Sequence, residues 1–92
     1  MVIIMVRKKM LPQTGTADIT TDGNGDGTVA ISFKNPMNTL DYYADAGIQE
    51  ADITGNITIG TKTINGCTIV LDGSAVTNGT VTVDWIAQQN VF

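Results

Sequence analysis

The chain has 92 residues, of which 42% are hydrophobic and 15% charged, a balance that indicates one small folded domain rather than a disordered tail. Its net charge of −4 argues against a nucleic-acid partner. One cysteine and no histidine exclude a disulfide within the chain and remove the usual ligands of a zinc site.

The N-terminal segment is apolar and then basic: MVIIMV at 1–6 precedes Arg7, Lys8 and Lys9. A secretory leader carries its charges first, and a membrane helix needs about 20 apolar residues. We therefore expect neither a cleaved leader nor membrane insertion. The segment is interpreted as an arm that attaches the chain to another subunit through Val2, Ile3, Ile4, Val6, Arg7, Lys8 and Lys9.

The stretch LPQTG at 11–15 matches the L-P-x-T-G signal of wall-anchored proteins. That signal works near a C-terminus, whereas a whole domain follows it here, so the match is interpreted as coincidence. Pro12 and Gly15 instead predict a linker. The expected organisation is an arm and linker at 1–15 and a folded domain at 16–92.

The loop TTDGNGDG contains Asp22, Asn24 and Asp26, which together resemble the start of a calcium loop. An EF-hand would need a carboxylate at its twelfth position, where this chain has Phe33, and helices on both sides, where it has strand-like sequence. Two interpretations remain. The favoured one is a tight turn that selects Asp, Asn and Gly for backbone geometry, and the other is a looser calcium site formed by Asp22, Asn24 and Asp26.

From residue 28 onward, apolar residues alternate with polar ones. This period of two predicts half-buried antiparallel strands, and the sequence shows no apolar stripe of helical spacing. We expect an all-β antiparallel sandwich of about six strands with an extended N-terminal arm. A solenoid would need a fixed repeat, and the spacing in ITGNITIGTKTINGCTI drifts. The predicted inward residues are Val29, Ile31, Phe33, Leu40, Tyr42, Ala44, Ala46, Ile48, Ile53, Ile57, Ile59, Val81, Val83, Trp85 and Ala87.

Turn signals separate these runs. Asn65-Gly66 and Asn78-Gly79 predict hairpins, because both residue types tolerate positive φ. Asp72-Gly73 and Asn35-Pro36 predict loops. Cys67 alternates with Ile69 and Leu71 and is expected to be a buried apolar thiol. Without histidine, catalysis would depend on carboxylates such as Asp41, Asp45 and Asp84, which we expect to be solvated, so the chain is predicted not to be an enzyme and to need no cofactor apart from the calcium alternative.

Three segments in order, TVAISFKNPMNTLDYYADAGI, GCTIVLDGS and VTVDWIAQ, resemble H-type lectin-like domains, which also form the C-terminal heads of phage tail fibres. The resemblance covers about residues 16–89. It implies a six-stranded sandwich that forms trimers and holds sugars in clefts between subunits. The chain departs from the pattern because those clefts use arginines, which its body lacks, and because Cys67 stands where an aromatic is usual.

Four residues are candidates for glycan contact. Trp85 matches the tryptophan of the family, although alternation with Val81 and Val83 favours core packing over a sugar platform. Tyr43 points away from Tyr42 and is expected to be exposed. Tyr43, Asp45, Trp85 and Asn78 of the DGSAVTNG loop are therefore named as possible sugar contacts.

The expected function is that of a non-enzymatic structural protein on the surface of a tailed phage or similar virus, as a fibre, spike or capsid decoration subunit. It would be made in the host cytoplasm, form a homo-oligomer, with a trimer favoured, bind other virion proteins and contact host glycans. The alternative is a free-standing soluble lectin or calcium-dependent carbohydrate-binding module. A third interpretation is a subunit that only cements a capsid lattice.

Overall fold

A computed structural model describes residues 12–89, so the predicted anchoring residues Val2 to Lys9 lie outside the described part of the chain. The described residues form strands joined by loops and turns, without a helix, and so without a helix that could cross a membrane. The all-β prediction is confirmed. The six strands are β1 (Gln13–Thr20), β2 (Gly27–Ser32), β3 (Tyr42–Ile48), β4 (Asn56–Thr63), β5 (Gly66–Asp72) and β6 (Thr80–Gln89).

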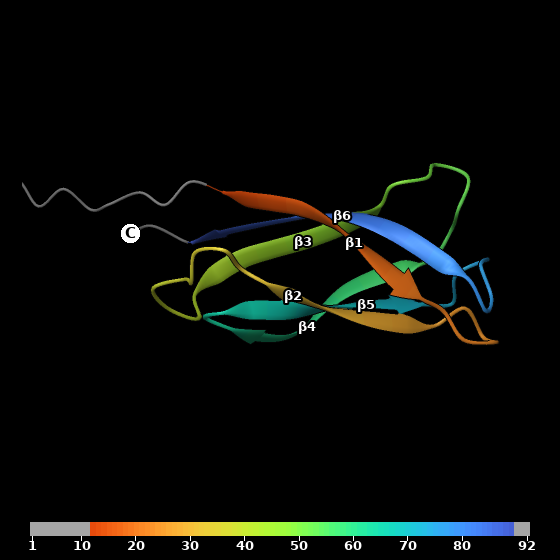
Figure 1. Ribbon diagram of the computed structural model, residues 1–92, viewed down its shortest axis with the longest axis horizontal. Helices are drawn as coiled ribbons and strands as arrows, with labels where there is room; N and C mark the ends of the chain where they lie inside the picture. The colour runs from red at the N-terminus through yellow and green to blue at the C-terminus, as the bar shows by residue number, and fades with distance from the viewer. Residues whose placement is uncertain (1–11, 90–92) are drawn as a thin grey trace, which may run out of the picture.

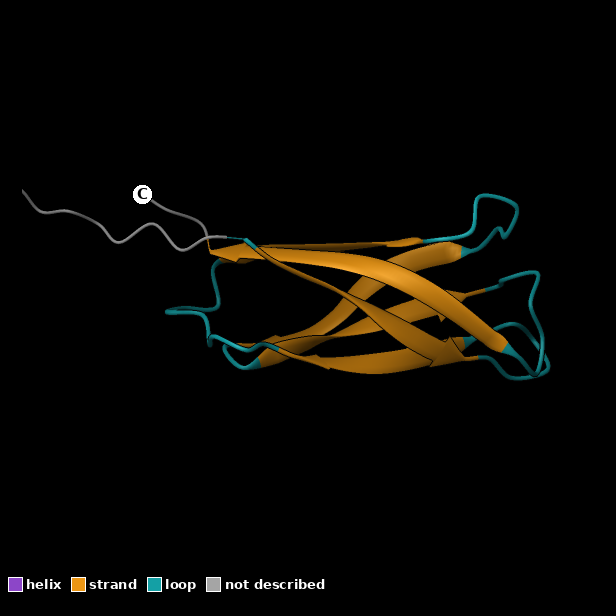
Figure 2. Cartoon of the chain, turned by 45° about the horizontal axis from the view of Figure 1, so that its top comes forward, coloured by secondary structure: helices purple, strands orange, loops and turns teal. Residues whose placement is uncertain are grey.

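The strands form two three-stranded antiparallel sheets packed face to face (Figures 1 and 2). One, sheet A, has the order β1-β6-β3, and the other, sheet B, has the order β2-β5-β4. Only the β4–β5 connection stays within a sheet, while every other connection crosses to the opposite layer. Residues far apart in sequence are therefore adjacent, as in the register that pairs Gly15 with Trp85 and Trp85 with Ala46.

The core lies between the sheets and comes from the predicted alternation. Its fully buried side chains belong mainly to the two central strands, β5 and β6, because each has a neighbour on both sides. The predicted burial of Cys67 is confirmed. Burying such side chains stabilises the fold by about 1.5–3 kcal/mol for each large aliphatic residue. The largest are Ile19, Ile69, Leu71, Val81 and Val83.

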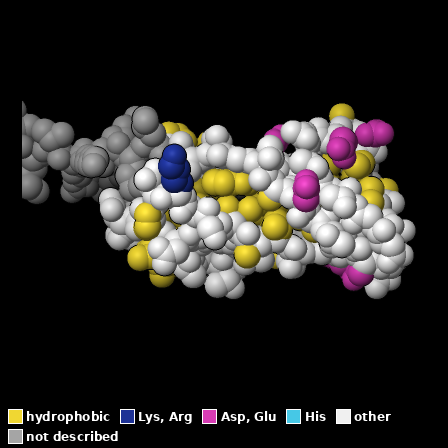
Figure 3. Space-filling view, viewed as in Figure 1, with side chains coloured by type: hydrophobic (Ala, Val, Ile, Leu, Met, Phe, Trp, Pro, Cys, Tyr) yellow, Lys and Arg dark blue, Asp and Glu magenta, His cyan; other side chains and the backbone are white. Residues whose placement is uncertain are grey.

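The edge strands of sheet A carry small residues toward the core, Gly15 and Ala17 on β1 and Ala44 and Ala46 on β3. Small side chains cover the opposite sheet incompletely, so these alanines are only partly buried. In Figure 3 apolar side chains are visible between the two sheets. The core is therefore buried most completely along β5 and β6 and only partly at the alanine positions of the edge strands.

Two details of the predicted faces and boundaries differ from the structure. Leu40 was expected to point inward, but β3 begins at Tyr42 and Leu40 lies in the preceding loop, 58% exposed. Residues 13–15, which we placed in the linker, form the start of β1 and pair with β6.

The turn chemistry is also only partly as predicted. Asn65-Gly66 does mark the β4–β5 hairpin, but neither residue has a positive φ. Gly66 is required because a Cβ there would overlap the carbonyl oxygen of Ile31. Asn78 does adopt a positive φ, of 50°, yet its loop joins β5 to β6 in different sheets, so the predicted second hairpin is wrong.

Candidate functional site

We call the end of the sandwich where β1 begins and β6 ends the arm end, and the opposite end the far end. At the far end, the loop between β1 and β2 is organised by Asp22. One carboxylate oxygen, Oδ1, accepts the backbone N–H groups of Asn24 at 2.8 Å and Asp26 at 3.0 Å. These bonds lower the pKa of Asp22, with the Asp26 amide as the larger cause. The structure thus gives Asp22 the role that the turn interpretation assigned to it.

The same loop is fastened to the loop between β5 and β6. The backbone N–H of Gly73 donates to Asp26 Oδ1 at 2.7 Å, and that of Asn78 donates to the carbonyl oxygen of Asp22 at 2.9 Å. A hydrogen bond and charge repulsion from Asp26 raise the pKa of Asp72. Within residues 12–89 no group of three acidic, cysteine or histidine side chains is placed to hold a metal ion. Of the predicted calcium ligands, Asp22 and Asp26 accept backbone N–H groups at this turn, while calcium binding stays a prediction.

Tyr43 and Asp45 lie together on the outer face of sheet A. Both point away from the core on β3, and Tyr43 is 53% exposed, as predicted. The Tyr43 hydroxyl donates to Asp45 Oδ2 at 3.1 Å, and this bond raises the pKa of Tyr43. Asp45 Oδ1 accepts the backbone N–H of Ala46 at 2.9 Å. An exposed ring beside a fixed carboxylate is suited to bind a sugar through stacking and hydroxyl donors.

Beside this pair is a hollow of about 240 Å³, where Gly47 leaves open space between Asp45 and Asp84. Asp84 lies directly opposite Gly47 on β6 and accepts a hydrogen bond from the Gln49 side chain at 3.3 Å. The hollow is lined by acidic and apolar groups. It would favour a ligand that donates hydrogen bonds, such as a neutral sugar.

The four residues predicted to contact glycans do not all come together, although Asp45 and Trp85 both line the hollow at Gly47. Trp85 is on the core-facing side of β6, opposite to the face that carries Tyr43 and Asp45, and it packs against the core as alternation predicted. Its exposed part lines a separate hollow near the arm end. Asn78 lies at the far end, in the loop that precedes β6. Tyr43 and Asp45 are the two of these four residues whose side chains are joined by a hydrogen bond.

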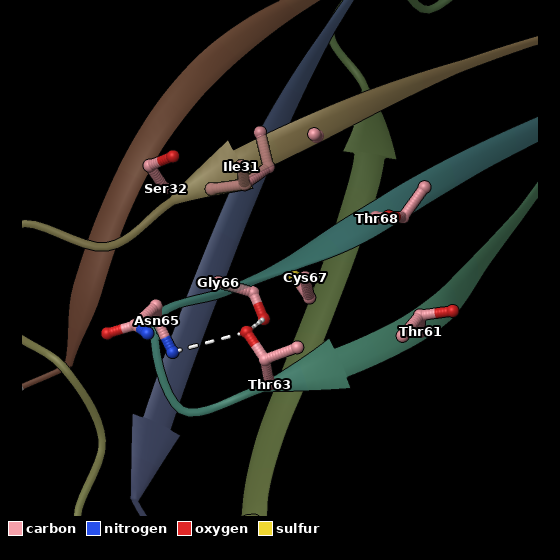
Figure 4. Close-up of a pocket in the computed structure, with 9 residues that line it drawn as sticks. Ile31, Ser32, Thr61, Thr63, Asn65, Gly66, Cys67 and Thr68 are labelled. Atoms are coloured by element: carbon pink, nitrogen blue, oxygen red, sulfur yellow. Dashed lines mark hydrogen bonds between the residues drawn. The ribbon is translucent and has the colours of Figure 1, made fainter.

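A third hollow, of about 220 Å³, lies on the outer face of sheet B (Figure 4). It was not predicted, because its residues are contributed by three strands whose adjacency depends on the topology. Thr63 donates its hydroxyl to the carbonyl oxygen of Gly66 at 3.2 Å and accepts the backbone N–H of Asn65 at the same distance. The polar residues around it are uncharged: Ser32, Thr61, Thr63, Asn65 and Thr68.

Cys67 also lines this hollow, but burial raises the pKa of its thiol. A thiol with a raised pKa remains protonated near neutral pH and is a poor nucleophile. The outer face of sheet B therefore offers hydroxyl and amide groups for binding rather than an activated thiol for chemistry.

Comparisons with protein-family models, curated proteins and solved structures found no match to the chain. The resemblance to H-type lectin-like domains stays a prediction.

Proposed function

We propose that this chain is a non-enzymatic structural subunit of a virion surface, a fibre, spike or capsid decoration protein that attaches at its arm end and turns its far end outward. The observation that supports this most is that the two ends of the sandwich differ in which parts of the chain they carry. β1 begins and β6 ends at the same end, so the apolar and basic residues 1–11 join the body there, while the loops 21–26, 49–55 and 73–79 lie at the opposite end (Figure 1).

The body also offers surfaces for assembly. β1, β2, β3 and β4 are edge strands, each with one side unpaired within the described residues. Such edges accept an added strand from a neighbour. The partly buried side chains of β3 and β4, Ala44, Ala46, Ile48, Ile57 and Ile59, supply apolar surface beside these edges. A homo-oligomer, with a trimer favoured, and contacts with other virion proteins are the assembly that we propose.

Glycan contact is the second part of the proposal, and the Tyr43–Asp45 pair is its candidate. The pair is exposed, preorganised by a 3.1 Å hydrogen bond and adjacent to the hollow at Gly47. The body is acidic. The chain has five lysines and arginines, three of them in the arm, so the body has two lysines and all nine carboxylates. That charge disfavours nucleic acid as a partner.

The assembly role is tested by sedimentation velocity of the full chain and of a variant lacking residues 1–11. We expect the full chain to sediment as one discrete oligomer and the truncated chain to shift toward the monomer. A full chain that stays monomeric at 100 µM, or a truncated chain that assembles equally well, would contradict the attachment role.

A glycan array with and without EDTA separates the alternatives. Glycan binding by the isolated monomer would favour a free-standing lectin, and loss of that binding in EDTA would favour a calcium-dependent module. Binding to virion particles without binding any glycan would favour a cementing role.

A further inference from the structure

The exposed part of Trp85 lines a hollow of about 270 Å³ at the arm end, which we call the Trp85 groove. Strands β1 and β6 of sheet A form one side, and the end of β2 with the residues after it forms the other. The groove is lined by Gln13, Thr14, Ser32, Lys34, Asn35 and Trp85. Ligand pockets usually have volumes of ~300–1,000 Å³, so a groove of this size suits a single sugar residue rather than a longer ligand.

The indole ring of Trp85 is held in place by Gly15 and Phe33. A Cβ built on Gly15 would lie 2.9 Å from the indole atoms Cε2, Cζ2 and Nε1, so the ring lies directly against the Gly15 backbone. Phe33 supports it with ring centroids 6.0 Å apart. Only part of the ring is buried, and no described residue accepts a hydrogen bond from its N–H. The groove therefore contains a fixed aromatic surface whose N–H donor has no partner among residues 12–89.

The opposite wall, formed by Ser32, Lys34 and Asn35, is also held in place, and it carries polar side chains without a hydrogen-bond partner among the described residues. The side chain of Gln13 makes two hydrogen bonds with the backbone of Asn35. Gln13 Nε2 donates to the Asn35 carbonyl oxygen at 2.6 Å, and the Asn35 N–H donates to Gln13 Oε1 at 3.1 Å. The side chains of Asn35 and Ser32 make no hydrogen bond with other described residues. Asn35 and Ser32 line the same hollow as Trp85, so among the described residues their amide and hydroxyl groups are left for a ligand.

Lys34 gives the groove its charge. The other lysine of the described body, Lys62, is engaged, because its ammonium donates to the carbonyl oxygen of Tyr42 at 2.8 Å and lies 4.6 Å from the Tyr42 ring centroid. Lys34 is paired with no described carboxylate, and no acidic residue lines the groove. Figure 3 shows one dark blue patch on this face, near the arm end, while the magenta side chains lie toward the far end. A lysine without a carboxylate partner in the described part of an acidic body favours an anionic ligand here.

We propose that the Trp85 groove binds a carboxylated pyranose, the acidic residue of a glycan such as a hexuronic or sialic acid. The apolar face of the sugar ring stacks on the indole of Trp85, its carboxylate pairs with the ammonium of Lys34, and its hydroxyls bond to Ser32 and Asn35. This inference rests on the proposed function only in that the ligand is a glycan. It names a second surface, the Trp85 groove, which shares only Trp85 with the hollow beside the Tyr43–Asp45 pair, and it specifies an acidic sugar as the ligand of that groove.

The chain contains one tryptophan, so its intrinsic fluorescence reports on ligands bound near Trp85. Trp85 also lines the hollow at Gly47, and the Lys34→Gln variant assigns the signal to the groove, because Lys34 lines the groove and not that hollow. Full-length protein is titrated with glucuronate, N-acetylneuraminate, glucose and acetate at low ionic strength. We expect a saturable change with at least one acidic sugar, and at least tenfold weaker binding of both glucose and acetate. Lys34→Gln should weaken acidic-sugar binding at least tenfold, while Thr77→Ala, at an exposed position of the loop at the far end, should leave it unchanged.

Equal binding of glucose and an acidic sugar would overturn the role of Lys34, and equal binding of acetate would overturn the stacking role of Trp85. No fluorescence change with either acidic sugar up to 50 mM, or full binding by Lys34→Gln, would overturn the proposal as a whole. The sedimentation experiment is independent of these titrations. If the chain is monomeric but binds an acidic sugar, the assembly role is refuted and the groove proposal stands. If the chain is oligomeric but binds no acidic sugar, the groove proposal is refuted and the assembly role stands.

Discussion

The two ends of the sandwich are closed by different means. The far end is closed by short side chains and by the backbone itself, with Asp22 and Asp26 accepting amide N–H groups and Gly25 and Gly73 at positive φ. The arm end is closed by long side chains that reach across to distant backbone groups, above all those of Gln89 and Tyr42.

At the arm end, Gln89 holds the loop between β2 and β3. It is buried, its Oε1 accepts the N–H groups of Asn38 and Thr39 at 2.7 and 3.1 Å, and its Nε2 donates to the carbonyl oxygen of Asp41 at 2.6 Å. The Tyr42 hydroxyl lies 3.0 Å from the carbonyl oxygens of both Thr63 and Gly66 and so ties β3 of sheet A to the hairpin of sheet B. The far end therefore depends on local backbone geometry, and the arm end on contacts between distant parts of the chain.

The largest effect is expected at Gly25. Its φ is +78°, and a Cβ there would overlap the carbonyl oxygen of Ser74, so Gly25→Ala should destabilise the fold by about 3 kcal/mol or more. Gly23→Ala is the matched control, because the nearest atom to its Cβ would be 3.9 Å away, and it should change stability by less than about 0.5 kcal/mol. Urea unfolding measures both. Similar losses in the two variants would show that the backbone of this loop does not close the far end.

Gln89→Leu should have the next largest effect. Leucine fills the space but leaves the N–H groups of Asn38 and Thr39 without their acceptor, at a cost of about 2–3 kcal/mol. The neighbouring Gln88 lies on the outer face of sheet A, so Gln88→Leu should change the free energy of unfolding by about 0.5 kcal/mol at most. Equal stabilities of the two variants would refute the structural role of Gln89.

A smaller effect is expected from removing one hydroxyl. Tyr42→Phe deletes the group that bonds to Thr63 and Gly66 and should cost about 1–2 kcal/mol. Burial raises the pKa of Tyr42, so the hydroxyl stays protonated and donating at neutral pH. Tyr43→Phe removes only an exposed bond to Asp45 and should leave the melting temperature almost unchanged. A larger loss from Tyr43→Phe would reverse the expected ranking.

The smallest expected effect is a dependence of the far end's stability on pH, caused by the titration of Asp22. The pKa of Asp22 is lowered from 3.8 in the folded state, so its ionised form stabilises the fold above that value, and the contribution is lost as the pH falls through the lower folded-state pKa. Asp22→Asn keeps an acceptor oxygen and removes the titration. Its urea midpoint should therefore fall less between pH 5 and pH 2 than that of the wild type. Asp52→Asn, whose side chain bonds to no described residue, should follow the wild type, and identical curves for all three proteins would contradict the role of Asp22.

The same contrast explains what could be predicted from the sequence. Alternation fixed the faces of the strands, and the Asp, Asn and Gly of the loop at 22–27 predicted a turn, because both signals are local. The roles of Gln89 and Lys34 depend on which loops meet at the arm end, and this follows from the topology rather than from neighbours in sequence. Period two placed Trp85 and Tyr43 on opposite sides of their strands, but only the register of Ala46 with Trp85 shows that the two strands are neighbours and that Trp85 and Tyr43 lie on opposite faces of one sheet.

The central claim, that the arm end attaches and the far end faces outward, is tested most directly by thiol labelling of the assembled protein. Cys67 is buried, so introduced cysteines report on their own positions. Leu40→Cys at the arm end should react with a maleimide at least tenfold more slowly in the full-length oligomer than in the chain lacking residues 1–11, whereas Thr77→Cys at the far end should react equally fast in both. Protection of Thr77→Cys, or of neither cysteine, would contradict the account.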